Sequence, residues 1–164
     1  MLILTNEQLI NQVVLQTNLI HRNLDDISDA DACIAPHGAN SANWLLGHVL
    51  VSRDEICQML GVARQLEQRV HTRYDAGTLP VSASGTDEIP LKTLLEMLDA
   101  QSAGYMAALR ALTAEKLAEP ITRPNGTVTT LGQRLMFYII FHEATHIGGF
   151  EFSRHAAGKH AGLI

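Results

Sequence analysis

Residues 141–149 read Phe-His-Glu-Ala-Thr-His-Ile-Gly-Gly, and this stretch lies within a long apolar run. His142 and His146 are four residues apart, so on a helix they lie one turn apart and about 40° from each other around the axis. Two imidazoles placed in this way can bind one metal ion. The stretch therefore predicts a helix that supplies two ligands of a metal site.

The same residues match the His-Glu-x-x-His signature of zinc proteases, in which the glutamate is the general base. The third ligand of those enzymes is missing from this helix. The metzincin spacing places Phe152 where a histidine is needed, and Glu151 lies too close along the same helix. Proteolysis is also disfavoured, because zinc proteases of this kind bind substrate along a sheet edge and the sequence predicts no such sheet. A third ligand must come from upstream.

His48 has the setting expected of that ligand. It lies midway along a predicted helix in residues 43–51, one turn after Trp44 and among aliphatic residues. A lone inward-facing histidine is usually a core residue with a hydrogen-bonded partner. Three such histidines need several partners, and a shared metal satisfies all of them. From the residues alone, core histidines and a metal triad both stay open.

Two segments, residues 44–48 (WLLGH) and 142–158 (HEATHIGGFEFSRHAAG), resemble those of the DinB/YfiT-like proteins. These are all-α four-helix bundles of the up-down-down-up type, with a metal held by one histidine on the second helix and an H-x-x-x-H pair on the fourth. The resemblance spans nearly the whole chain and implies that His48, His142 and His146 are the metal ligands. Relatives often carry Gln where this chain has Gly149, which would leave a wider pocket.

Composition indicates one globular domain over residues 1–164, because 46% of the chain is hydrophobic and 18% is charged. No run approaches the ~20 apolar residues that span a bilayer, so no membrane association is expected. A net charge of −5, with 12 scattered basic residues, argues against binding to nucleic acid. Cys33 and Cys57 show no metal or disulfide pattern and are expected to be buried free thiols of a cytoplasmic protein.

Apolar residues at helical spacing predict four long helices. Capping boxes at Thr5 and Thr130, each with Gln three residues later, mark the starts of the first and the fourth. Asn125-Gly126, flanked by β-branched residues, predicts a small hairpin before the fourth helix. The first helix is expected to end near residue 24, the second to cover about 41–60, and the third to follow Pro90.

The connection 61–90 is unusually long for a compact domain and is expected to be functional or mobile. One or two helical turns are expected within it, and it is well placed to cover the mouth of the metal site. Its His71, Arg73 and Tyr74 are expected to be solvated. Glu55, on the same face as His48, is expected at the solvent end of the bundle.

Three histidines leave coordination positions open for water or substrate, which is typical of a catalytic metal site. Zinc is the default ion for imidazole ligands, and nickel, cobalt or iron would also fit. Such an ion lowers the pKa of bound water toward ~7 or holds a thiolate as a nucleophile. Glu143 is the candidate general base, and the alternative is a salt-bridge residue at the bundle surface.

The family resemblance implies two functions of different classes. The first is an enzyme, a metal-dependent thiol transferase or hydrolase that activates a small-molecule thiol toward an electrophile. The second is a metal-binding stress-response protein without turnover. A pocket with exchangeable metal ligands would favour the first, and a coordinatively closed site the second. The resemblance also implies a homodimer.

Overall fold

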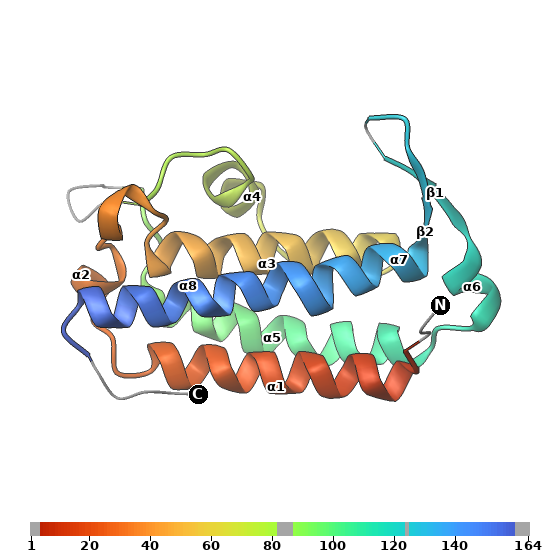
Figure 1. Cartoon of the computed structure of the whole chain (residues 1–164), viewed down its shortest axis with the longest axis horizontal. Helices are drawn as coiled ribbons and strands as arrows, with labels where there is room; N and C mark the ends of the chain where they lie inside the picture. Colours follow the sequence, from red (N-terminus) through yellow and green to blue (C-terminus); the bar gives the residue numbers. More distant parts are fainter. Residues whose placement is uncertain (1–3, 82–86, 124, 160–164) are drawn as a thin grey trace.

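The computed structural model describes residues 4–81, 87–123 and 125–159 and confirms the predicted all-α four-helix bundle. The fourth long helix consists of two α-helical segments joined by a π-helical one (Figure 1). The long helices are α1 (Asn6–Leu24), α3 (Ala42–Met59), α5 (Leu91–Arg110) and the continuous α7 (Leu131–Met136), η2 (Phe137–His142) and α8 (Glu143–Ala156). The short helices are α2 (Asp29–Ala32), η1 (Pro36–Gly38), α4 (Gln68–Tyr74) and α6 (Ala114–Ala118).

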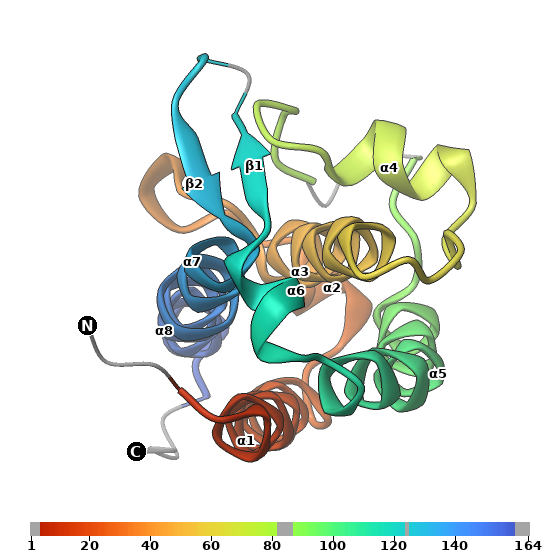
Figure 2. The same cartoon turned by 90° about the vertical axis from the view of Figure 1, so that its right-hand side faces the viewer.

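The topology is up-down-down-up, as predicted. In Figure 1, α1 and α8 run in one direction, and α3 and α5 run in the other. Around the bundle, α3 lies between α5 and α8, and α1 closes the ring (Figure 2). Because α3 and α5 are neighbours and run parallel, the chain must return along a bundle about 27 Å long before α5 begins. The long connection after α3 is a consequence of this topology.

Local sequence signals set the helix starts where predicted. Thr5 and Thr130 both form complete capping boxes, and the Ser41 hydroxyl accepts a hydrogen bond from the Trp44 backbone N–H. Gly61 has a φ of 82°, a left-handed conformation that suits glycine after the end of α3. The predicted boundaries of the first two helices are therefore confirmed.

Helix α3 is buried on nearly all sides, with 15 of its 18 residues inside. A helix that is buried all round must be covered on its outer face as well. Helix α4 supplies this cover (Figure 2). The Tyr74 ring lies so close to α3 that a Cβ at Gly47 would be 2.3 Å from it. Gly47 therefore lets α4 pack directly on the helix that carries His48.

Two short strands form the predicted hairpin, with Ile121 paired to Thr129. The hairpin, β1 (Pro120–Thr122) and β2 (Val128–Thr130), extends from the same side of the bundle as α4 (Figure 1). Among the residues that the structure describes, no helix is long and apolar enough to cross a bilayer.

Candidate metal centre

The structure brings the three predicted ligands together. The Nε2 atom of His142 lies 3.3 Å from Nε2 of His48 and 3.1 Å from Nε2 of His146. One ring nitrogen from each histidine falls within 4.8 Å of the other two. A tetrahedral ion with ~2.0–2.1 Å bonds to nitrogen places its ligand atoms about 3.3 Å apart. The spacing therefore fits one shared ion.

His48 is held in the orientation that a ligand needs. Its Nδ1–H donates to the backbone carbonyl of Tyr74 at 2.9 Å, since a carbonyl can only accept. In the neutral ring this bond leaves Nε2 unprotonated and facing the other histidines. The Trp44 ring stacks on the His48 ring, with ring centroids 4.8 Å apart, and the Trp44 indole N–H donates to the Thr78 hydroxyl. The backbone and the stacked ring thus fix both tautomer and direction.

His142 is the last residue of an irregular part of the fourth helix, and His146 lies one turn after it. Residues Phe137–His142 form a π-helical segment, a feature often found at functional sites. The buried Gln16 of α1 donates its side-chain N–H to the Ile139 carbonyl at 2.5 Å, so this backbone group is paired within the bundle. Tyr138 packs edge-on to the His142 ring, with centroids 5.4 Å apart. The irregular segment ends at the first ligand of the pair.

Both of these imidazoles are neutral at physiological pH. Burial, with a smaller contribution from His48, lowers the pKa of His142 to about 4. Burial and the neighbouring His142 lower the pKa of His146 to about 3. A metal binds the neutral imidazole, so these depressed pKa values keep the ligands in their binding form.

Glu143 lies inside the bundle and faces Arg53 of α3. Its side chain is 5% exposed and that of Arg53 is 0% exposed. Arg53 Nε donates to Glu143 Oε2 at 3.2 Å, and Arg53 Nη2 donates to Glu143 Oε1 and to the Thr17 hydroxyl. Glu143 is thus an interhelix salt-bridge residue, but in the core and not at the predicted surface position. Its assignment as general base stays a prediction.

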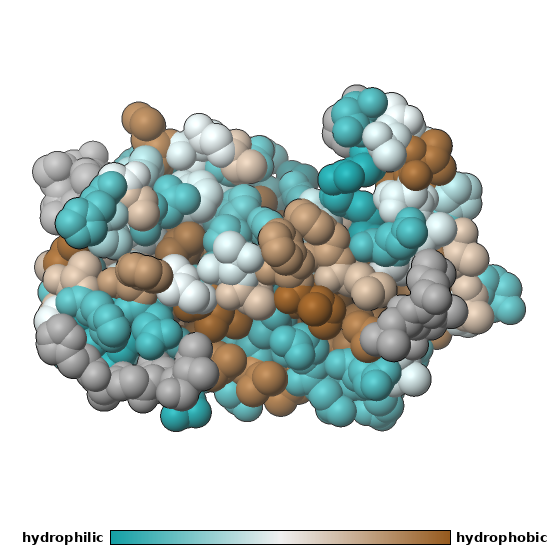
Figure 3. All heavy atoms as spheres, in the orientation of Figure 1, coloured by the Kyte–Doolittle hydropathy of each residue, from teal (hydrophilic) through white to brown (hydrophobic). Residues whose placement is uncertain are grey.

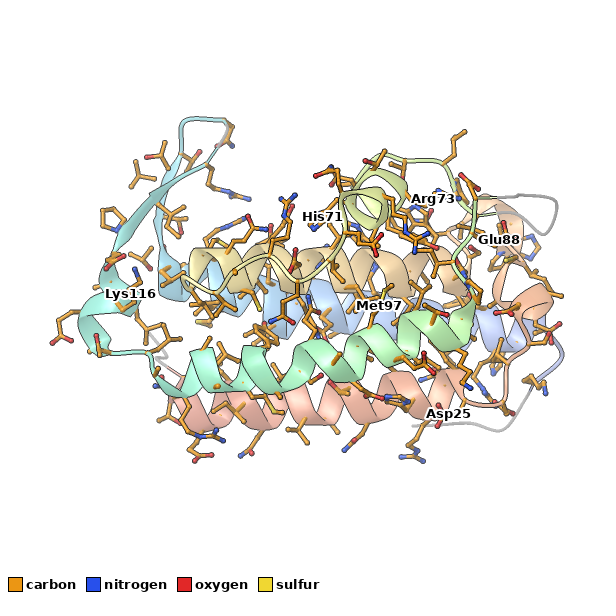
Figure 4. All side chains as sticks on the ribbon, turned by 180° about the vertical axis from the view of Figure 1, so that it is seen from behind. Asp25, His71, Arg73, Glu88, Met97 and Lys116 are labelled. Carbon is orange, nitrogen blue, oxygen red and sulfur yellow. The ribbon has the colours of Figure 1, made fainter. Side chains whose placement is uncertain are left out.

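The prediction that the side chains of the 61–90 connection are solvated is wrong for His71 and Tyr74, which are both buried. His71 pairs with the fully buried Asp54 of α3 at 2.8 Å, between α4 and α3 (Figure 4). The Tyr74 hydroxyl donates to Asn43 and accepts from the Ile89 backbone N–H. These bonds fix α4 on α3, and with it the carbonyl that orients His48.

A cavity of about 340 Å³ lies beside the triad and is lined by His48 and His142. Its other walls come from α3, from Asp75 and Ala76 after α4, from the hairpin and from the start of the fourth helix. In Figure 3 the surface is hollowed between the hairpin and the α4 side. Glu55 is exposed, as predicted, and borders this cavity. The volume suits a small molecule next to the metal position.

Sequence reasoning missed the groups that hold the ligands in place. The buried role of Gln16 could have been predicted, because it is a polar residue in the apolar stripe of the first helix. The same holds for Arg53 and Asp54, since they lie in a helix whose other residues are mostly apolar. The role of the Tyr74 carbonyl could not, because any residue type supplies a backbone carbonyl.

A four-helix bundle of this topology with an open three-histidine centre defines a class of metal-site proteins. The sequence profile of the DinB superfamily matches residues 12–149, and the chain belongs to that superfamily. No curated protein sequence matches this chain.

Solved structures share the fold. A DinB-like protein from Bacillus cereus ATCC 10987 is 18% identical with a TM-score of 0.72, covering 99% of each chain. YfiT from Bacillus subtilis, described as a probable metal-dependent hydrolase with an unusual four-helix bundle topology, is 15% identical with a TM-score of 0.68 and covers 93% of this chain and 87% of its own. A mutant of a mycothiol-dependent maleylpyruvate isomerase is 12% identical with a TM-score of 0.59, over 86% of this chain and 60% of its own.

Proposed function

We propose that His48, His142 and His146 bind one divalent metal ion and that the protein is a metal-dependent enzyme, a thiol transferase or hydrolase acting on a small molecule. Zinc is the ion we propose first, with nickel, cobalt and iron as alternatives. The observation that carries the proposal is the convergence of three ring nitrogens, two of them from histidines that line a cavity of about 340 Å³.

The bound ion would supply a Lewis acid that activates a thiol or water. The protein's own residues prepare the site for it. Tyr74 and Trp44 hold the His48 ring, and burial keeps His142 and His146 neutral. The walls of the cavity would hold the substrate beside these ligands, and this positioning would contribute to the rate.

The second candidate is a metal-binding stress-response protein without turnover. A closed structural site has four protein ligands and no space for a substrate. Among the described residues, only three histidines form such a ligand group, and a cavity reaches two of them. These observations favour the enzyme. The descriptions of YfiT as a hydrolase and of the isomerase as mycothiol-dependent point in the same direction.

Turnover assays on metal-loaded protein test this choice. Protein loaded in turn with zinc, nickel, cobalt and iron is assayed for loss of a free small thiol in the presence of an electrophile, and for hydrolysis of an activated ester. We expect metal-dependent turnover in one of these assays, and its loss in His146→Ala. Full metal occupancy with no turnover in any of them would favour the stress-response protein.

We also propose that two copies of the chain pair through an apolar face. Exposed apolar side chains gather on the fourth helix and on α1, over the centre of the face shown in Figure 3. Large exposed apolar patches often mark such contacts. We expect wild type to sediment as a dimer and Phe141→Ser as a monomer; a monomeric wild type at high concentration contradicts this pairing. The exposed large apolar residues of these two helices are Val14, Leu15, Phe137, Ile140, Phe141 and Phe152.

A cytoplasmic location is proposed as well. Cys33 and Cys57 are both buried free thiols. Free cysteines are typical of proteins in a reducing compartment.

A further inference from the structure

The cavity beside the triad is lined by two arginines that the proposed function leaves without a role. Arg123 follows β1 in the hairpin, and Arg134 lies in α7. Both elements lie at the same end of the bundle (Figure 1). The Arg123 backbone is fixed by the turn, because its N–H donates to Thr127 at 2.9 Å and its carbonyl accepts from Gly126 at 2.8 Å.

Among the residues that the structure describes, no carboxylate forms an ion pair with either guanidinium. Across residues 4–81, 87–123 and 125–159, the exposed Arg123 side chain has no hydrogen-bond or ion-pair partner. Arg134 Nη2 donates to the Tyr138 hydroxyl at 2.7 Å, and its guanidinium lies 4.6 Å from the centre of the Tyr138 ring. Within the same ranges, no acid lies at ion-pair distance from Arg134. Both arginines can therefore donate to a ligand.

Among the described residues, neither acid of the cavity wall forms an ion pair with these arginines. Glu55 lies near the Tyr138 hydroxyl, whose pKa is raised by burial and by this carboxylate, and the Ala76 backbone N–H donates to Asp75 at 2.7 Å. Two arginines and two acids balance in formal charge, and three neutral imidazoles leave the full charge of a divalent ion in place. A metal-loaded cavity is therefore net positive and attracts an anion.

We propose that Arg123, together with Arg134, forms a subsite for the carboxylate of a small anionic ligand whose other end binds at the histidine triad. The proposal deepens the proposed function and rests on it, because the triad is taken as the anchor for the ligand's metal-binding group. Planar guanidinium groups suit carboxylates because they donate paired hydrogen bonds. A substrate or thiol with a free carboxylate fits this arrangement, and a neutral analogue does not.

The test uses cobalt-loaded full-length protein and a pair of probes that differ in charge alone, β-mercaptopropionate and its amide. Dissociation constants come from calorimetry, and a sulfur-to-cobalt charge-transfer band reports where the sulfur binds. We expect wild type to bind the carboxylate about fivefold more tightly than the amide, a ratio that corresponds to the free energy of a partly exposed ion pair. Arg123→Gln should remove most of this preference and leave amide binding unchanged.

Arg22→Gln is the matched control, because Arg22 is an exposed arginine of α1 outside the cavity and its loss changes the net charge equally. This variant should keep the wild-type preference. Equal affinity for the two probes in wild type, binding of neither, or an unchanged preference in both Arg123→Gln and Arg134→Gln overturns the subsite. A preserved charge preference without the charge-transfer band supports the subsite and contradicts the proposed role of the metal as a thiol anchor.

Discussion

His142 and Glu143 are consecutive residues that belong to two very different polar sites. Glu143 is buried and its two oxygens accept from one guanidinium, so the Arg53–Glu143 pair is closed. The Nε2 atom of His142 lies next to Nε2 of His48 and of His146, and the residue borders a cavity. One site is a closed ion pair within the protein, whereas the other is a histidine group at a cavity.

The difference shows that one pair of helices carries both a buried ion pair and a histidine group that could hold a metal ion. Arg53 and His48 lie on α3, and Glu143 and His142 lie at the junction of η2 and α8. The Arg53–Glu143 pair therefore joins the same two helices whose histidines form the triad. We infer that the Arg53–Glu143 pair stabilises the packing of these two helices and that the triad is the metal site.

Removing the charge of Glu143 should have the largest effect on stability. Glu143→Gln keeps the shape of the side chain but leaves Arg53 buried without a counter-charge, which should cost about 3 kcal/mol. Denaturant unfolding of metal-free protein measures this loss. Bound metal per chain should remain as in wild type at low temperature.

A double variant separates the stabilising role of the Arg53–Glu143 pair from general-base catalysis. Arg53→Met with Glu143→Leu removes both charges and should recover much of the lost stability. If Glu143→Gln unfolds like wild type yet loses turnover, Glu143 is the general base and the comparison between the two sites is wrong.

A methyl group at Gly47 should disturb the open site through its support. Gly47→Ala forces the Tyr74 ring away, because the added Cβ would lie 2.3 Å from it, and we expect a loss of about 2 kcal/mol. Metal affinity should fall as well, since the Tyr74 carbonyl orients His48. Isothermal titration with zinc measures that change.

Gly148→Ala is the matched control on the other ligand-bearing helix. A Cβ at Gly148 meets nothing within 4 Å, so this change should stabilise the protein by about 0.5–1 kcal/mol and leave zinc affinity unchanged. Equal behaviour of the two alanine variants would show that close packing of Tyr74 does not support the site.

The change in the free energy of unfolding with pH should be smaller than the effects of these substitutions, because His142 and His146 are partly exposed. The pKa values of about 4 for His142 and about 3 for His146 lie below the unfolded value of 6.5, so the unfolded chain binds more protons below that value. Protonation of these two histidines therefore does not destabilise the fold above pH 6.5. Below pH 6.5 it lowers the free energy of unfolding progressively, until pH reaches about 4 for His142 and about 3 for His146. Unfolding of metal-free protein between pH 7 and pH 4 measures it, and His146→Asn should flatten the curve. An equally steep curve in this variant would contradict the assignment.

Local sequence signals predicted much of this fold. Capping boxes at Thr5 and Thr130, and the glycine after α3, gave helix boundaries because each is decided within a few residues. For the third long helix the sequence predicted the start but not the width of the buried face. Leu94 and Gln101 are both buried, because α5 packs against two neighbouring helices and its buried face is wider than one stripe.

The candidate site was predictable only where residue type decides it. Three histidines in predicted helices indicated the triad, and the structure brings them together. The carbonyl of Tyr74, the π-helical segment and the partner of Glu143 depend on which helices meet, and one sequence does not show this. The burial of His71 follows from Asp54, which lies 17 residues earlier in the chain.

Metal content is the measurement that tests the central claim most directly. Protein purified without a histidine tag is loaded with zinc under non-chelating conditions, and bound metal per chain is compared for wild type, His48→Ala and Glu143→Gln. We expect about one ion per chain in wild type and in Glu143→Gln, and none bound tightly in His48→Ala. Wild type that binds no metal tightly would show that the triad is a set of core histidines, and the proposed function would fall with it.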